Sequence, residues 1–277
     1  MNQSVPDRKY FRPVAYLNKL KHLVARLILN FGVSIPVITI IDSYHITFLA
    51  NSYLEYLFRA QNSYQREKVT MYWLREVIEP KHVVYDVGAN VGAYSLFAGY
   101  KVHKSGGRVY AFEPSFFNFN SLSRNIEANQ LDGTVIPYPI AFGESSREGK
   151  LFLSSTITGS ALHGLDRSES EGKEFSAEFF QGIYVVALDE FCFQPGVEFP
   201  NHIKIDVDGG ESGILCGMQS VMRDNRLKSI MIEINRDLSD GEIEEEIISC
   251  GLKLQCVEKW PRKNSYNKLF VRQQSVL

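Results

Sequence analysis

The sequence predicts an α/β fold in which helices cover both faces of a mostly parallel, seven-stranded sheet. From His82 onward, short apolar runs of strand length alternate with amphipathic segments of helical period. The runs are apolar throughout, which is typical of parallel strands buried on both faces. A glycine-rich turn directly follows the first run, where sheets of this kind bind ligands. With 277 residues, 44% of them hydrophobic, the chain can form one large domain with an extension.

The predicted strands are His82–Val87, Gly107–Phe112, Thr134–Ala141, His202–Val207, Ser229–Ile234, Leu252–Val257 and Lys268–Arg272, the last two forming a hairpin. Ser115 is expected to cap a helix that runs through Asn129, and Glu211–Met222 reads as a second helix. A capping box of Ser239 and Glu242 predicts the start of a third helix, which Gly251 ends. The long segment Leu153 to Gln181 between strands is expected to act as a lid at the ligand-binding edge.

Residues 1–63 predict an N-terminal helix and β-hairpin extension, and residues 64–277 the main domain. The helix is expected at Val14–Phe31 and the hairpin strands at Val33–Ile41 and His45–Ala50, with a turn at Asp42-Ser43. A helix over Tyr64–Val77 then leads into the main domain.

The N-terminal helix is basic on its polar positions, which are Lys19, Lys21, His22 and Arg26. Such a helix can lie peripherally on an anionic membrane surface. More commonly an amphipathic face packs on its own domain or on a second subunit, so a homodimer stays open as well.

The composition excludes several classes of protein. With 30 basic and 32 acidic side chains the net charge is −2, which predicts no nucleic-acid partner. The four cysteines form no C-x-x-C pair, so we expect no zinc site and a reducing, cytoplasmic location. No secretory signal is recognised, and the longest uncharged run, Leu27 to Ile41, is shorter than the ~20 residues of a membrane span.

The turn after the first strand reads Asp86-Val87-Gly88-Ala89-Asn90-Val91-Gly92. It lacks two of the three glycines of a dinucleotide fingerprint, and it also lacks the lysine of a P-loop. We expect Gly88 and Gly92 to let the backbone come close to a ligand, with Ala89 and Asn90 completing the cradle. The turn instead resembles motif I of class I methyltransferases, which bind a cationic sulfonium ligand that carries an ammonium group. This resemblance implies that the Asp86 carboxylate lies near the amino group of the ligand, directly or through water.

A second acid, Glu113, stands at the end of the next strand and is followed by Pro114. A carboxylate in this place can accept hydrogen bonds from the hydroxyls of a ribose. Pro114 would orient the loop beneath an adenosine, and Ala141 at the end of the third strand completes the expected cofactor site.

These motifs resemble the FkbM family of class I, Rossmann-like methyltransferases. The matching segments are VYDVGANVG (84–92), VYAFEP (109–114), ALDEF (187–191), IKIDVDGGE (203–211) and IMIEI (230–234), and the resemblance runs from about Tyr64 to Arg272. It implies S-adenosyl-L-methionine as cofactor and O-methylation, often of a sugar or polyketide hydroxyl. The sequence departs from the family at Asp208, where Glu is usual, and at Gly210, where Ala is usual.

The acids Asp206, Asp208 and Glu211 crowd the end of the fourth strand, where a carboxylate can act as a general base. We predict Asp206 as the base, with Asp208 as the second choice and His163 in the long loop as an alternative. Lys204 could pair with one of these carboxylates or simply pack.

A divalent metal bound by Asp206, Glu233 and Asn235 is possible but is not favoured, since the resemblance does not require one.

The leading hypothesis is an O-methyltransferase acting on a hydroxyl of a sugar or glycan, whether surface polysaccharide or secondary metabolite. The alternatives are a methyltransferase for a non-sugar acceptor and a non-catalytic S-adenosylmethionine-binding scaffold.

Overall fold

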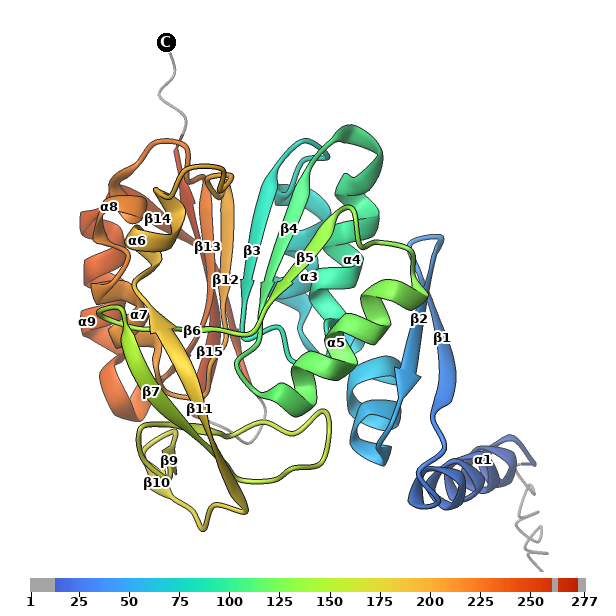
Figure 1. Cartoon of the computed structure of the whole chain (residues 1–277). Coiled ribbons are helices and arrows are strands. Elements are labelled where there is room, and N and C mark those ends of the chain that lie inside the picture. The colour runs from blue at the N-terminus through green and yellow to red at the C-terminus, as the bar shows by residue number, and fades with distance from the viewer. Residues whose placement is uncertain (1–12, 261–263, 274–277) are drawn as a thin grey trace, which may run out of the picture.

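The computed structural model describes residues 13–260 and 264–273, and its centre is a seven-stranded sheet (Figure 1). The strand order is β14-β15-β13-β12-β3-β4-β5. The bounds are β3 Val83–Val87, β4 Arg108–Phe112, β5 Val135–Tyr138, β12 His202–Ile205, β13 Ser229–Asn235, β14 Leu252–Lys259 and β15 Ser265–Arg272. Strand β15 runs antiparallel to both neighbours and every other pairing in this sheet is parallel. The predicted mostly parallel sheet and its C-terminal hairpin are therefore confirmed.

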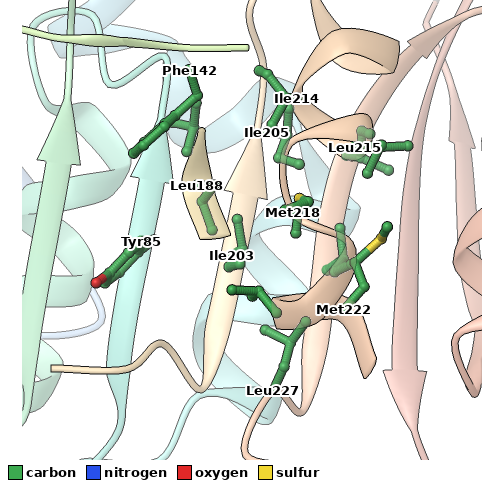
Figure 2. Close-up of a cluster of buried hydrophobic side chains, with 14 of the residues drawn as sticks. Tyr85, Phe142, Leu188, Ile203, Ile205, Ile214, Leu215, Met218, Met222 and Leu227 are labelled. Atoms are coloured by element: carbon green, nitrogen blue, oxygen red, sulfur yellow. The ribbon is translucent and has the colours of Figure 1, made fainter. Parts of the chain in front are cut away.

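Helices cover both faces of the sheet, as Figure 1 shows. One face carries α4 (Ala93–Val102) and α5 (Phe116–Ala128), and the other carries α6 (Leu188–Cys192), α7 (Glu211–Cys216), α8 (Gln219–Arg223) and α9 (Arg236–Ser249). Strand β3 is buried along its whole length, because Val83, Tyr85 and Val87 face the second layer while Val84 faces the first. Figure 2 shows the core beneath α7 and α8, which includes Tyr85, Phe142, Leu188, Ile203, Ile205, Ile214, Leu215, Met218, Met222 and Leu227.

Three predicted helices differ from the structure. The helix predicted over Glu211–Met222 is broken into α7 and α8 at Gly217, whose carbonyl oxygen accepts the Asp189 N–H at 2.8 Å. Gly217 also packs closely on Gly143, since a Cβ there would lie 2.1 Å from the Gly143 carbonyl oxygen. The Asp189 carboxylate accepts the backbone N–H groups of Ser220 and Val221, both at 2.8 Å, and so caps the second piece.

The second difference is the start of α9, which begins at Arg236 directly after β13, so the predicted capping box at Ser239 is wrong as the start of the helix. The third is the segment predicted as one helix over Tyr64–Val77. It consists of α2 (Ser63–Arg66), α3 (Lys68–Tyr72) and a π-helical turn η2 (Trp73–Val77).

A second, smaller sheet lies beside the main one. Strand β5 ends at Tyr138, short of the predicted Ala141, and Ala141–Phe142 instead forms β6, which pairs with β11 (Phe179–Val186). Strands β7 (Arg147–Leu153) and β8 (Gly164–Leu165) complete this sheet in the order β6-β11-β7-β8. The predicted long loop is therefore partly built into β8, β9 (Glu169–Ser170) and β10 (Lys173–Glu174).

The N-terminal extension consists of α1 (Pro13–Asn30), β1 (Ile35–Ile41), β2 (Tyr44–Ala50) and a π-helical turn η1 (Glu55–Gln61). The β1–β2 turn places Asp42 and Ser43 at φ 48° and 68°, which suits the twist of a tight hairpin. Strand β2 is fixed to α5, since the Asn125 and Asn129 side chains accept its backbone N–H groups at 2.8 Å. The division at residues 63/64 stays a prediction.

Candidate active site

A cavity of about 1200 Å³ opens at the carboxyl ends of β3, β4, β12 and β13, which is the ligand-binding edge of open α/β sheets. It brings together most of the predicted site residues, namely Gly88, Asn90, Glu113, Pro114, Ala141, His163, Asp206, Asp208, Glu233 and Asn235. Asp86, Ala89 and Gly92 are not among its lining residues.

The two glycines of the turn are required by packing between chain segments. Gly88 has φ 82°, and a Cβ there would lie 1.9 Å from the carbonyl oxygen of Asp206. Gly92 has φ 91°, and its Cβ would lie 2.6 Å from the side chain of Leu122. The turn therefore packs against the end of β12 and against α5, while Gly88 also reaches the cavity.

Asp86 is buried, and it accepts a hydrogen bond from Ser95 Oγ at 2.5 Å. The Lys204 ammonium, also buried, lies 3.9 Å from Asp86 Oδ1 and 2.8 Å from Asp206 Oδ2. Burial alone lowers the pKa of Lys204, but the Asp206 and Asp86 carboxylates raise it above its ordinary value, so the lysine stays charged. Lys204 thus joins the ends of β3 and β12, and the predicted contact of Asp86 with a ligand stays a prediction.

Asp206 is the predicted base, and its side chain is 28% exposed and lines the cavity. Its backbone N–H donates to the carbonyl oxygen of Val87 at 3.0 Å, so the residue extends the pairing of β12 with β3. The Lys204 ammonium donates to Oδ2 of Asp206 at 2.8 Å and so fixes the direction of the carboxylate. Asp206 therefore presents an oriented carboxylate to the cavity.

Glu113 binds the glycine turn as well as facing the cavity. Its Oε2 accepts the Asn90 N–H at 2.8 Å and its Oε1 accepts the Ser115 N–H at 2.9 Å. Burial raises the pKa of Glu113 to about 7, although these backbone hydrogen bonds oppose the change. The Asn118 side chain also hydrogen-bonds this carboxylate. A carboxylate has about four acceptor sites, so one remains for a ligand hydroxyl. The start of α5 is capped by Glu113 and Gln181 and not by the predicted Ser115 side chain, for which the structure shows no capping hydrogen bond.

Asp208 and Glu211 differ from Asp206 in their surroundings. Asp208 Oδ2 accepts the Leu162 N–H at 2.6 Å, so this carboxylate anchors the long loop. Glu211 is buried against the cavity, and burial together with Asp208 and Asp206 raises its pKa to about 7. The sequence places Glu211 in the acidic cluster but does not single it out as a site residue.

His163 also lines the cavity, where its Nδ1 accepts the Ser154 N–H at 3.3 Å. Burial and the charge of Arg59 lower the pKa of His163 to about 4. The ring is neutral at pH 7, its Nδ1 already accepts the Ser154 N–H, and its proton is therefore on Nε2. Neither nitrogen is left to accept a proton from a hydroxyl, so His163 is a weaker candidate for the base than Asp206.

The wall opposite the strand ends comes from residues that the sequence analysis missed. Arg59 on η1 donates from Nε and Nη2 to the Gly159 carbonyl oxygen, at 3.0 and 2.9 Å. The Arg66 guanidinium lies over the rings of Phe58 and Trp260, at 5.6 and 5.4 Å from their centroids. These residues line the cavity. Arg59 and Arg66 lie on two separate short helices, η1 and α2, so no single helical period in the sequence brings them together.

The structure gives less support to a metal site formed by Asp206, Glu233 and Asn235. The residues described, 13–260 and 264–273, include no group of three or more His, Cys, Asp and Glu side chains arranged to hold a metal ion. Glu233 Oε2 accepts the Trp260 Nε1–H at 3.1 Å, so that carboxylate already has a partner.

Comparisons with known proteins identify the family of this chain. The family model described as "Methyltransferase FkbM domain" matches residues 86–254. Hexuronic acid methyltransferase AglP of Haloferax volcanii is 27% identical over 209 residues, which cover 75% of this chain and 78% of that protein. 31-O-demethyl-FK506 methyltransferase FkbM of Streptomyces tacrolimicus is 25% identical over 184 residues, covering 59% and 70% respectively.

Among solved structures, a methyltransferase FkbM from Methylobacillus flagellatus superposes with a TM-score of 0.52 at 16% identity. The match covers 74% of this chain and 48% of that one, and at this identity it shows the Rossmann-like fold alone. The family model, in contrast, covers more than half of the chain and contains Asp86, Glu113 and Asp206. This chain is therefore an enzyme that belongs to the FkbM family of methyltransferases.

Proposed function

We propose that this methyltransferase uses S-adenosylmethionine to methylate a hydroxyl group of a sugar or glycan. The observation that carries the proposal is that Glu113 and Asp206, from the ends of two different strands, face one cavity. On this proposal, Glu113 would hold the ribose of the cofactor and Asp206 would receive a proton. When bound, S-adenosylmethionine supplies an electrophilic methyl group.

The lining of the cavity suits this cofactor. Carboxylates predominate along the strand ends, which favours a ligand that carries a sulfonium and an ammonium group. Ser160 Oγ is buried at the cavity wall and has no hydrogen-bond partner within the described part of the chain, so it can bond a polar ligand group. The volume exceeds the roughly 300–1,000 Å³ of a single small-molecule site, which leaves room for an acceptor beside the cofactor.

Asp206 is the proposed general base, because it combines exposure to the cavity with an oriented carboxylate. It would accept the proton of the acceptor hydroxyl, and Lys204 would hold it in place. The rest of the catalytic effect would come from alignment of the two substrates by the cavity walls.

A sugar acceptor is supported by the relationship to a hexuronic acid methyltransferase and by Arg59 and Arg66, which we call the arginine wall of the cavity. None of the carboxylates in the described ranges pairs with Arg66, whose two ring contacts hold the planar guanidinium at the cavity. Such a group suits the carboxylate of an acidic sugar. The relationship to a methyltransferase for 31-O-demethyl-FK506 keeps a non-sugar hydroxyl as the second candidate.

Calorimetric titration with S-adenosylhomocysteine tests the cofactor, using wild type, Glu113→Ala and, as a matched control, the exposed acid variant Asp132→Ala. We expect micromolar binding by wild type and the control, and loss of binding by Glu113→Ala. A screen for transfer of labelled methyl to uronic acid glycosides, neutral glycosides and macrolide alcohols then tests the acceptor. Failure of the folded wild type to bind S-adenosylhomocysteine would overturn the cofactor, whereas binding without transfer to any hydroxyl would favour the scaffold alternative.

A further inference from the structure

Helix α1 has apolar side chains on two opposite sides. On the inner side, Ala25 and Leu29 are buried. The His22 ring lies edge-on to the rings of Tyr53 and Tyr56, with 6.3 and 5.7 Å between ring centroids. On the outer side, six large apolar side chains are between 38% and 83% exposed, namely Leu20, Leu23, Val24, Leu27, Ile28 and Phe31. We call these six residues the outer stripe.

The residues of the outer stripe share one side of the helix, opposite the buried side. Successive residues of a helix turn by about 100°, so positions spaced by three and four residues lie on one side. The stripe follows this spacing from Leu20 to Phe31, and Ala25 and Leu29 fall directly opposite. The helix therefore packs against its own domain with one narrow face and leaves a wider apolar face uncovered. A contiguous exposed patch of this kind marks an interaction surface.

The charges beside the outer stripe indicate what covers it. Helix α1 contains no acidic residue, and its exposed Lys19, Lys21 and Arg26 flank the stripe on both sides. Two copies of this face would bring like charges together, whereas anionic lipid headgroups would complement them. A second exposed apolar pair, Ile38 and Ile40, lies on the outward side of β1 in the same N-terminal extension.

We propose that the outer stripe of α1 and the outward side of β1 form a docking surface for an anionic lipid bilayer. Figure 1 shows α1 and the β1–β2 hairpin at the periphery of the molecule, away from α6–α9. Within the described ranges no helix is both long and apolar enough to cross a membrane. The proposed contact is with the surface of the bilayer.

The docking surface is linked to the cavity by a short path. Tyr56 and Leu57 of η1 pack with the inner side of α1, and the next two residues, Phe58 and Arg59, line the cavity. Docking would therefore bring the arginine wall of the cavity close to the lipid surface, where an acceptor attached to a lipid could be reached.

Vesicle co-sedimentation of the full chain tests the proposal, with vesicles of phosphatidylcholine alone and of phosphatidylcholine mixed with phosphatidylglycerol. We expect wild type to sediment with the anionic vesicles and to be released by salt. Leu23→Ser combined with Leu27→Ser should weaken this binding at least tenfold, an estimate of roughly 1.4 kcal/mol, as should Lys19→Glu combined with Lys21→Glu. The matched control is Phe180→Ser combined with Tyr184→Ser, which removes equally exposed apolar groups from β11 and should bind as wild type does.

Unchanged thermal unfolding of each variant would show that the fold is intact, and this readout is independent of the cofactor. Failure of wild type to bind anionic vesicles would overturn the proposal. So would a dimer, seen by light scattering, that the Leu23→Ser and Leu27→Ser changes dissociate, because the stripe would then be covered by a second copy.

Discussion

The two walls of the cavity are built in different ways. One wall consists of the ends of β3, β4 and β12, where Glu113 and Asp206 are fixed by hydrogen bonds to the backbone of neighbouring strands. The other consists of η1, α2 and the loop around Gly159, where Arg59 and Arg66 are held by a single carbonyl oxygen and by aromatic rings. The first wall carries carboxylates, and the second carries the two guanidinium groups together with the carboxylate of Glu67, which follows α2.

On the proposed function, this difference would separate chemistry from selection. The strand-end wall lies within residues 86–254, which the family model matches, and would carry the groups that any acceptor requires. Most of the opposite wall precedes residue 86 and would carry the groups that discriminate among acceptors. Substitutions in the first wall should therefore affect every substrate, and substitutions in the second only some.

The largest effect is expected from Asp206→Asn. The change preserves shape but removes the proton acceptor, so the single-turnover rate of methyl transfer should fall about 10²- to 10³-fold. Binding of S-adenosylhomocysteine should change little. The matched control is Asp208→Asn, for which we expect a smaller loss, because that carboxylate holds the Leu162 N–H. A normal rate in Asp206→Asn would show that another residue is the base, and the proposal that the strand-end wall carries the chemistry would then be wrong.

The next effect concerns Glu113, whose pKa burial raises to about 7. A ligand hydroxyl donates to the ionised form, so binding releases a proton and affinity falls as the pH falls below 7. The Kd of wild type for S-adenosylhomocysteine should weaken about tenfold between pH 8 and pH 6. Glu113→Gln should bind about 10- to 100-fold more weakly at pH 8 and show no such pH dependence in calorimetry. A retained pH dependence in the variant would assign the titration to another group, such as Glu211.

The same contrast explains what the sequence alone could predict. Strands such as His82–Val87 and the acids at their ends are encoded by local patterns, because a buried parallel strand must be apolar and its end must face the ligand edge. The break between α7 and α8 lies at Gly217, which packs on Gly143, and Arg59 reaches the site by bonding Gly159. Contacts between such distant segments leave no local pattern in one sequence.

A smaller effect is expected from Arg66→Ala. Loss of the guanidinium should raise the KM for an acidic sugar about tenfold, as for one charged hydrogen bond, and leave the KM for a neutral sugar and the affinity for S-adenosylhomocysteine unchanged. Arg66→Lys should rescue the loss only in part, since lysine lacks the planar fork. The exposed, remote Arg223→Ala serves as control. Equal losses for acidic and neutral sugars would show that this wall does not select on charge.

The smallest effect is expected from His163→Ala, although His163 lies in the cavity and is the residue type that most often serves as a general base. Burial and Arg59 lower its pKa to about 4, and its Nδ1 already accepts the Ser154 N–H. The rate should therefore fall less than about threefold, compared with the 10²-fold or more expected for a general base.

The pH–rate profile distinguishes a general base from a residue that only shapes the loop. If His163 were the base, wild type would lose activity as the pH fell towards 4, and the variant would lack that limb at a rate at least 10²-fold lower. An unchanged profile with a nearly unchanged rate would leave the proton transfer to the strand-end wall and assign His163 to the shape of the loop.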